Sequence, residues 1–327
     1  MKSNCYPALA GIAACALLTA CGGGGSSSAP PTSGTPAPSP SPTPSPTPTP
    51  TPSASYSTFA ALTGDRAFAS SCGELVVSGS NYFAIGSTAF GNGIPISYAA
   101  SSQTYTVAAP PLTIAYGPAD LDPAAPTDTI GYRKVDSANF ANRFSITRPT
   151  LASGSLDYVR HARTLFRETN GTIHDAFCVI GVPTLLTDPL PSSSINFPAY
   201  SLRGTASATI SGSRKQYDLA ESTMTFTANP TSRAVNLSIT LVGREISSTG
   251  LSDTRINFGQ FDGQSSVDGA AQSFGMTLQS PTRISSGSQA AGWFFGPSGA
   301  ELGLTFTIRV NDSASQIEAV GSVVADR

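Results

Sequence analysis

The chain has 327 residues, a formal net charge of −2 and a charged fraction of 12%. It has neither the basic excess of a nucleic-acid-binding protein nor an acidic tract that would attract a cationic partner. Gly, Ser, Thr and Ala are abundant and apolar residues come in short runs, which favours β-structure, because helices need longer stretches with a 3.6-residue period.

Residues 1–20 have the features of a bacterial lipoprotein signal peptide. Lys2 precedes an apolar run from Ala8 to Ala20 that is too short to span a bilayer comfortably. The small residues Thr19 and Ala20 lie directly before Cys21, which we expect to receive a diacylglycerol and then an acyl chain such as palmitate. The alternative is an ordinary signal peptide that happens to contain a cysteine.

The residues after Cys21 indicate where the protein is held. Gly22 follows the cysteine in place of an acidic residue, which resembles the signal for sorting to the outer membrane of a Gram-negative cell. Residues 21–55 are rich first in Gly and Ser and then in Pro, Ser and Thr, which predicts a disordered, extended stalk. We therefore expect a lipid-anchored outer-membrane protein on the cell surface, with the periplasmic face as the alternative.

The number of cysteines predicts one disulfide. Cys5 and Cys15 leave with the signal peptide and Cys21 carries lipid, so Cys72 and Cys178 are the pair that remains in an oxidising compartment. A bridge between them would close a loop of about a hundred residues and stabilise the fold by roughly 2–5 kcal/mol. Two buried free thiols are the alternative.

Residues 56–182 are predicted to form a first, β-rich domain. Short apolar runs alternate there with turn formers, and Asn170-Gly171 between two such runs is the strongest hairpin signal in the chain. One short helix is expected within residues 59–69. Residues 183–198 are rich in Pro and Ser and predict a linker, because proline removes a backbone donor from a sheet.

Residues 199–327 have a regular β rhythm. From Ala234 to Leu241 apolar side chains alternate with polar ones, as in a strand with one buried face. Eight such antiparallel strands predict a closed up-and-down barrel, because closure removes exposed edges; an open sandwich is the alternative. The predicted strands are Tyr200–Ile210, Thr223–Ala228, Ala234–Leu241, Thr254–Phe261, Gln272–Gln279, Ala291–Phe295, Glu301–Val310 and Gln316–Val324.

The hairpin between the sixth and seventh of these strands carries a recognisable motif. It reads Gly292-Trp293-Phe294-Phe295-Gly296-Pro297-Ser298-Gly299-Ala300-Glu301-Leu302-Gly303. The aromatic residues end one strand, Gly296-Pro297 turns the chain, and Gly303 permits a close neighbour in the returning strand that Glu301 begins. The motif resembles the signature hairpin of the transferrin-binding protein B-like family of Gram-negative lipoproteins, with Leu304 where that family usually has a second glycine.

The resemblance implies an all-β fold in which a handle-like β domain precedes an eight-stranded antiparallel barrel, as in a single lobe of this family. It also implies a non-enzymatic protein that binds an external protein, or a haem or iron ligand, with an outer-membrane transporter or translocator as a further partner. A structural envelope lipoprotein with no soluble ligand is the alternative.

The sequence contains none of the common catalytic signatures. A Gly-x-Ser-x-Gly elbow, a Gly-rich phosphate loop and a His-Glu-x-x-His motif are all missing, so we expect no enzymatic activity, no cofactor and no metal site. Arg160, His161 and Arg163 form a cationic run that could bind an anion such as a carboxylate or a haem propionate; a solvated strand face is the alternative. His174 next to Asp175 is expected to be a surface pair.

Overall fold

The computed structural model describes residues 55–210, 212–269, 272–312 and 315–327. The predicted signal peptide, the lipidation of Cys21 and the stalk up to residue 54 lie outside these residues. The all-β prediction is confirmed, since the described residues form strands and three short 3-10 turns, η1(Phe59–Ala61), η2(Pro118–Asp120) and η3(Pro297–Gly299). No helix among them has the length and apolarity needed to cross a membrane.

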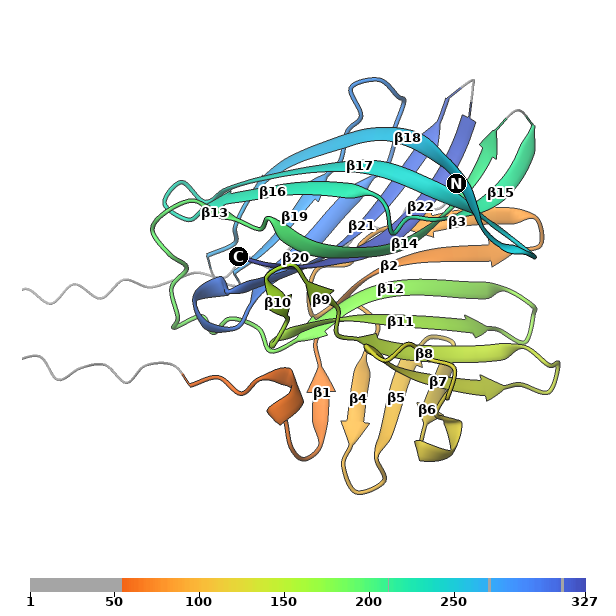
Figure 1. The fold of residues 1–327 in the computed structure, drawn as a ribbon, viewed down its shortest axis with the longest axis horizontal. Coiled ribbons are helices and arrows are strands. Elements are labelled where there is room, and N and C mark those ends of the chain that lie inside the picture. Colours follow the sequence, from red (N-terminus) through yellow and green to blue (C-terminus); the bar gives the residue numbers. More distant parts are fainter. Residues whose placement is uncertain (1–54, 211, 270–271, 313–314) are drawn as a thin grey trace, which may run out of the picture. The chain divides into compact units, whose positions relative to one another are not determined.

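The first folded region, which we call the handle (residues 55–182), contains two larger sheets and a small ribbon (Figure 1). The six-stranded sheet has the order β3(Asn81–Ile85), β2(Ser70–Ser78), β12(Ile173–Gly181), β11(Val159–Arg167), β8(Ala141–Thr147) and β7(Thr129–Val135). The four-stranded sheet has the order β1(Arg66–Phe68), β4(Ile96–Ala99), β5(Thr104–Ala109) and β6(Leu112–Tyr116), and the ribbon pairs β9(Thr150–Leu151) with β10(Gly154–Ser155).

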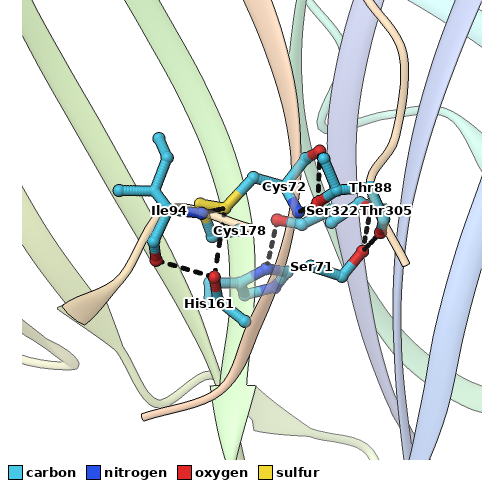
Figure 2. Close-up of a disulfide and its surroundings, with 9 residues drawn as sticks. Ser71, Cys72, Thr88, Ile94, His161, Cys178, Thr305 and Ser322 are labelled. Carbon is cyan, nitrogen blue, oxygen red and sulfur yellow. Dashed lines mark hydrogen bonds between the residues drawn. A yellow bond between two sulfur atoms is a disulfide. The ribbon is translucent and has the colours of Figure 1, made fainter. Parts of the chain in front are cut away.

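The two larger handle sheets enclose a common apolar core. Phe144 on β8 and Tyr116 on β6 stack with ring centroids 5.7 Å apart, and both side chains are buried. The predicted disulfide between Cys72 and Cys178 is present in this core and joins the neighbouring strands β2 and β12 (Figure 2). The bridge therefore fastens the first strands of the handle to its last strand, 106 residues further along the chain.

The second folded region is the predicted antiparallel barrel. Its strands are β14(Ala199–Ile210), β15(Ser213–Asp218), β16(Thr223–Asn229), β17(Ala234–Ser247), β18(Gly250–Ser266), β19(Ser273–Thr277), β20(Gln289–Phe295), β21(Glu301–Asn311) and β22(Ser315–Asp326), and β13(Ile195–Asn196) adds to β16. The ring is completed where Asp262 and Gln279 exchange backbone hydrogen bonds of 2.7 and 2.8 Å between β18 and the end of β19.

The eight predicted barrel strands correspond to nine segments because one strand is interrupted. β15 and β16 both pair with β17, with Asp218 opposite Arg244 and Thr223 opposite Thr240. Asp218 and Thr223 are five residues apart, whereas their partners on β17 are four residues apart. The extra residue makes residues 219–222 a bulge within one long strand. The sequence analysis missed β15, because its residues Ser-Arg-Lys-Gln-Tyr-Asp contain one apolar position and show no alternation.

Two local predictions in the handle had different outcomes. The Asn170-Gly171 hairpin is confirmed, since it joins β11 to β12 and Gly171 has a φ of 91°, which suits glycine. The short helix within residues 59–69 is wrong beyond the single 3-10 turn at Phe59–Ala61. Arg66–Phe68 instead forms β1, because pairing with β4 satisfies its backbone and brings Phe68 into the core.

The barrel is filled by apolar side chains. Ile239, Phe261, Phe294 and Phe306 are fully buried members of one large cluster, and they come from four different strands. Strand alternation places these side chains inside and polar residues outside. The barrel is therefore a packed support on whose outer surface the handle rests.

The second face of the six-stranded handle sheet packs on the outside of β21 and β22. Ser71 on β2 lies 2.7 Å from the hydroxyl of Thr305 on β21, and Phe177 on β12 packs with Val320 on β22. Figure 2 shows that the contact between Ser71 and Thr305 lies on the side of the sheet away from the disulfide. The sheet is therefore buried on both faces, by the handle core and by the barrel.

The motif hairpin lies at this handle–barrel interface. Glu301, only 4% exposed, accepts backbone hydrogen bonds from Asp157 (2.5 Å), Tyr158 (2.9 Å) and Val159 (2.7 Å) at the start of β11. Burial raises the pKa of Glu301, and these three donors together with Arg160 act against that rise. One carboxylate thus satisfies three consecutive backbone groups of the handle.

The other motif residues shape the same contact. A Cβ at Gly303 would lie 2.9 Å from Val159 of the handle, so a side chain there would push β11 away. Phe294 points into the barrel, whereas Trp293 and Phe295 pack on Phe90 of the handle with centroids 4.8 and 5.4 Å away. The remaining motif residues make the turn: Gly296 has a φ of 70°, Pro297 opens η3, and Gly292 has no room for a Cβ.

We predict that Glu301→Gln lowers the free energy of unfolding by about 1–3 kcal/mol, because the amide nitrogen cannot accept a hydrogen bond and strands a buried N–H. Urea denaturation of the full chain measures the effect. The control is Glu245→Gln, which removes a solvent-exposed bond to Lys215 and should cost less than about 1 kcal/mol. Equal effects of the two substitutions would contradict this assignment.

Removal of the disulfide is predicted to cost about 2–5 kcal/mol, because the long closed loop restricts the unfolded chain. The comparison is between the oxidised protein and a Cys72→Ala/Cys178→Ala variant in urea. Mass spectrometry before and after reduction provides the control, since a bridged chain gains two hydrogens. A mass that does not change on reduction would contradict the prediction. Equal urea midpoints for the oxidised protein and the double variant would contradict it as well.

Candidate ligand-binding groove

A groove of about 890 Å³ lies between the outer strands of the six-stranded handle sheet and the barrel. Strands β7, β8 and β11 form its handle wall, and β14 with the bulge after β15 forms its barrel wall. The side chains that define it include Arg143, His161 and Arg163 on the handle and Tyr200, Arg203 and Leu251 on the barrel.

His161 forms the floor of the groove. Its Nδ1 lies 2.8 Å from Ser322 Oγ on β22, and its Nε2 lies 3.2 Å from Ser201 Oγ on β14 (Figure 2 shows the first of these contacts). Burial, and to a lesser degree the charge of Arg203, lowers the pKa of His161 to about 3. The ring is therefore neutral near pH 7 and connects one handle strand to two barrel strands.

Two ion pairs fix the walls. The guanidinium of Arg163 donates to both carboxylate oxygens of Asp175 at 2.8 Å and lies over the ring of Phe177, 4.6 Å from its centroid. Arg203 on the barrel reaches Asp128 of the handle at 3.3 Å. These contacts hold two arginines in defined orientations on opposite sides of the groove.

The predicted run of Arg160, His161 and Arg163 does not form one cluster. Alternation along β11 sends Arg160 to the opposite face from the other two residues, where it donates to the carbonyls of Leu156 (2.9 Å) and Val159 (2.7 Å) and is 3% exposed. His161 and Arg163 line the groove. The interpretation of the run as a single anion site is corrected, because adjacent residues of a strand point apart.

Several groove residues were missed by the sequence analysis. Arg203 of the barrel lines the groove together with Arg143 of the handle and pairs with Asp128, and the barrel residue reaches this place only because the handle packs on the barrel. No local motif marks them. The alternation of side chains along a strand could have helped, because it places Arg160 on the opposite face from His161 and Arg163.

The expected pair of His174 and Asp175 is also wrong. Asp175 faces the groove, whereas His174 lies on the other face, where its Nδ1 is 2.5 Å from Glu74 and its Nε2 is 2.9 Å from Glu168. Burial opposes the charged ring, but the bonds and charges of the two glutamates outweigh it and raise the pKa of His174. His174 also stacks on Phe166, with ring centroids 4.6 Å apart.

The polar side chains that line the groove can make ionic and hydrogen-bonded contacts. Ser322 and Ser201 touch a histidine whose lowered pKa makes it a weak general base. Among the described residues, no set of three or more His, Cys, Asp or Glu side chains is placed to hold a metal ion.

Comparison with known proteins gives structural similarity only. No protein-family profile matches the chain. No curated protein sequence matches it either.

Among solved structures, the chain is similar to transferrin binding protein B from Haemophilus parasuis, with 13% identity over 79% of this chain and 46% of that chain and a TM-score of 0.39. It is also similar to transferrin binding protein B from serogroup B Neisseria meningitidis, with 11% identity over 79% of this chain and 44% of that chain and a TM-score of 0.40. A third similar structure is HpuA from Kingella denitrificans, solved in complex with human haemoglobin, with 14% identity over 80% of this chain and 87% of that chain and a TM-score of 0.36. The chain spans about half the length of the transferrin binding protein B structures.

Acid is predicted to weaken the handle–barrel contact through His161. The folded protein lowers its pKa to about 3 from an ordinary value of 6.5. The unfolded chain therefore binds a proton that the folded chain excludes, and the free energy of unfolding falls as the pH drops from about 6.5 toward 3. Urea denaturation at a series of pH values should show a shallower acid loss for His161→Gln than for the unaltered chain.

His174 provides the opposing control, since the chain has two histidines. Its raised pKa means that its stabilising contribution is fully present below the ordinary pKa of 6.5 and disappears as the pH rises through the folded value. His174→Gln should therefore cost most stability in mild acid and make the acid loss steeper. If both substitutions change the pH profile in the same direction, the assignment of the two histidines is wrong.

Proposed function

We propose that this chain is a non-enzymatic binding protein that captures an external protein ligand in the groove between handle and barrel. The observation that supports this most directly is the groove itself, which places fixed arginines in a cavity of about 890 Å³. A cavity of this size is in the range that proteins use for specific ligands.

The walls of the groove are held in place before any ligand arrives. Glu301 and His161 join the handle to the barrel through buried bonds, and Arg203 spans the two regions. A binding site whose walls are already ordered loses less conformational entropy when it binds. This rigidity favours recognition of a ligand with a defined shape.

Part of the groove rim is apolar. Leu251, at the start of β18, is 47% exposed, and its cross-strand partner Ile246 is 43% exposed. Ala124 and Pro126 form an exposed, apolar edge on the handle side. Exposed apolar side chains around a polar groove are typical of protein interaction sites, so a protein ligand is favoured over a small solute.

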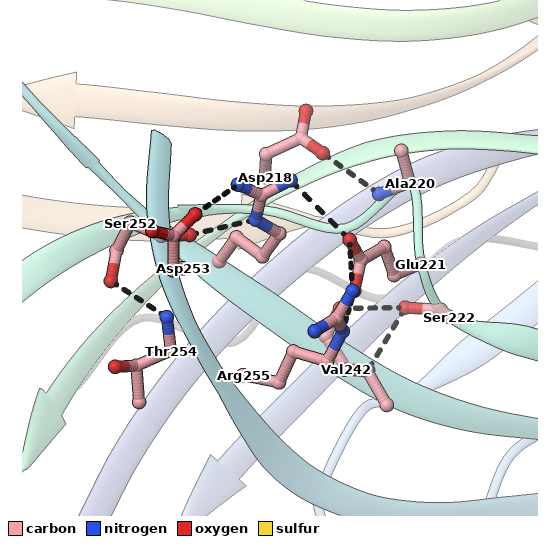
Figure 3. Close-up of polar contacts among 10 residues, drawn as sticks. Asp218, Ala220, Glu221, Ser222, Val242, Ser252, Asp253, Thr254 and Arg255 are labelled. Carbon is pink, nitrogen blue, oxygen red and sulfur yellow. Dashed lines mark hydrogen bonds and ion pairs between the residues drawn. The ribbon is translucent and has the colours of Figure 1, made fainter. Parts of the chain in front are cut away.

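An ion-pair network fixes the hairpin that carries Leu251. Glu221 in the bulge after β15 bonds to Arg255 on β18 and lies 3.4 Å from Arg244 on β17 (Figure 3). The backbone carbonyl of Ser252 accepts a further bond of 2.7 Å from Arg244. The apolar rim is thus attached to the barrel wall.

The setting that we propose follows from the sequence. Lipid on Cys21 would anchor the chain in the outer membrane, and residues 22–55 would project the binding region from it. The motif hairpin resembles that of lipoproteins that bind iron- or haem-carrying host proteins, which makes transferrin and haemoglobin suitable first probes and an outer-membrane transporter a suitable partner. A structural role in the envelope without a soluble ligand is the alternative.

The test is binding of the full chain to transferrin, haemoglobin and free haem by biolayer interferometry. Ala220→Trp would fill the groove, since Ala220 is exposed and lines it. We expect at least one of these probes to bind and Ala220→Trp to weaken it more than about tenfold, which corresponds to about 1.4 kcal/mol.

The matched control is Thr225→Trp, at an exposed position of β16 that does not line the groove. It should leave the affinity unchanged while adding the same indole to the surface. Binding that responds equally to both substitutions would place the ligand elsewhere. No binding to any probe would favour the structural alternative.

A further inference from the structure

Two arginines face each other at the outer edge of the handle. Arg133 on β7 and Arg143 on β8 are register partners, so both side chains project from the same face of the sheet. Both are exposed, and Arg143 lines the groove. Within the part of the chain that the structure describes, neither guanidinium has an ion-pair partner.

Such a pair is unfavourable when it is left alone. Like charges directly opposite each other on neighbouring strands repel and destabilise the sheet. The barrel contains the same arrangement in Arg244 and Arg255, which are register partners on β17 and β18. The two pairs can therefore be compared directly within one protein.

A carboxylate relieves the repulsion in the barrel pair. Glu221 Oε1 lies 3.4 Å from Arg244 and 3.2 Å from Arg255, and its second oxygen accepts from Arg255 as well (Figure 3). Asp253 adds a contact of 3.6 Å to Arg244. One acidic side chain between two cross-strand arginines is thus a solution that this fold already uses.

The carboxylates around the groove are committed to other groups and do not serve Arg133 and Arg143. Each has a partner of its own: Asp122 accepts from the backbone of Ala124, Asp128 holds Arg203, Asp136 holds Arg167, Asp175 holds Arg163, and Asp218 accepts from the backbone of Ala220. Among the residues that the structure describes, no carboxylate therefore balances Arg133 and Arg143, and a carboxylate from outside the chain could do so.

We propose that Arg133 and Arg143 form a subsite for a carboxylate of the ligand, so that the protein ligand presents an acidic segment to this end of the groove. This proposal rests on the proposed function of the groove and specifies the chemical character of the ligand segment that binds there. A carboxylate between the two guanidinium groups reproduces the contacts of Glu221 in the barrel. The ligand carboxylate would supply the negative charge that Arg133 and Arg143 lack.

The experiment measures binding of a hexaglutamate peptide to the full chain by calorimetry, with hexaglutamine and inorganic phosphate as comparison probes. We expect hexaglutamate to bind and hexaglutamine not to bind. Arg133→Gln and Arg143→Gln should each weaken hexaglutamate about tenfold, the change expected for losing one charge-assisted hydrogen bond. The double variant should abolish the binding.

Two further variants make the result specific. Arg66→Gln removes one exposed positive charge from the four-stranded sheet and should leave hexaglutamate binding unchanged, whereas equal weakening would mean general electrostatic attraction and would overturn the proposal. Without peptide, Arg143→Gln should keep or raise the melting temperature, because it removes a repulsion. A fall in melting temperature would assign Arg143 a structural role and overturn the proposal too.

The outcomes also separate this subsite from the proposed function. If a probe protein binds and Ala220→Trp blocks it while both arginine variants bind normally, the groove functions and the acidic subsite is wrong. If hexaglutamate binds through the two arginines while no probe protein binds, the subsite stands and the choice of protein ligand is wrong. Binding of phosphate with no binding of hexaglutamate would overturn the preference for an acidic segment.

Discussion

One buried carboxylate holds the handle on the barrel. The oxygens of Glu301 accept three consecutive backbone N–H groups at residues 157–159, immediately before β11 carries His161 and Arg163 into the groove. Because a strand has fixed spacing between residues, fixing its first residues fixes the direction and height of those that follow. Glu301 of the barrel therefore determines where the groove floor lies. Gly303 has no side chain, which allows β11 to approach the barrel closely enough for these bonds.

The six-stranded sheet separates two tasks by the alternation of its side chains. One face carries the disulfide, Phe144 and the handle core, and the other carries Ser71, His161 and Arg163 toward the barrel and the groove. The same division explains the two histidines, because burial at the interface lowers the pKa of His161, whereas the bonds and charges of two glutamates raise the pKa of His174. The handle core and the proposed groove thus lie on opposite sides of one sheet.

The parts of the fold with a repeating pattern could be predicted from the sequence. Alternation identified the barrel strands around Leu237 and Leu304, and counting cysteines identified the Cys72–Cys178 bridge. Where pattern is missing the prediction failed, as for the polar strand β15 and for the assignment of Arg160 to the site. The groove was beyond reach, because it depends on how two sheets pack, and packing brings together residues that no local motif connects.

The filled barrel limits where the proposed ligand binding can vary. With Ile239, Phe261 and Phe306 occupying its interior, a change inside would cost packing energy and leave the ligand unaffected. The outer rim has no such constraint, since Ile246 and Leu251 are exposed on a hairpin whose base is held by Glu221. If the groove functions as proposed, substitutions at the rim alter what is recognised while the barrel, the interface at Glu301 and the groove floor keep their geometry.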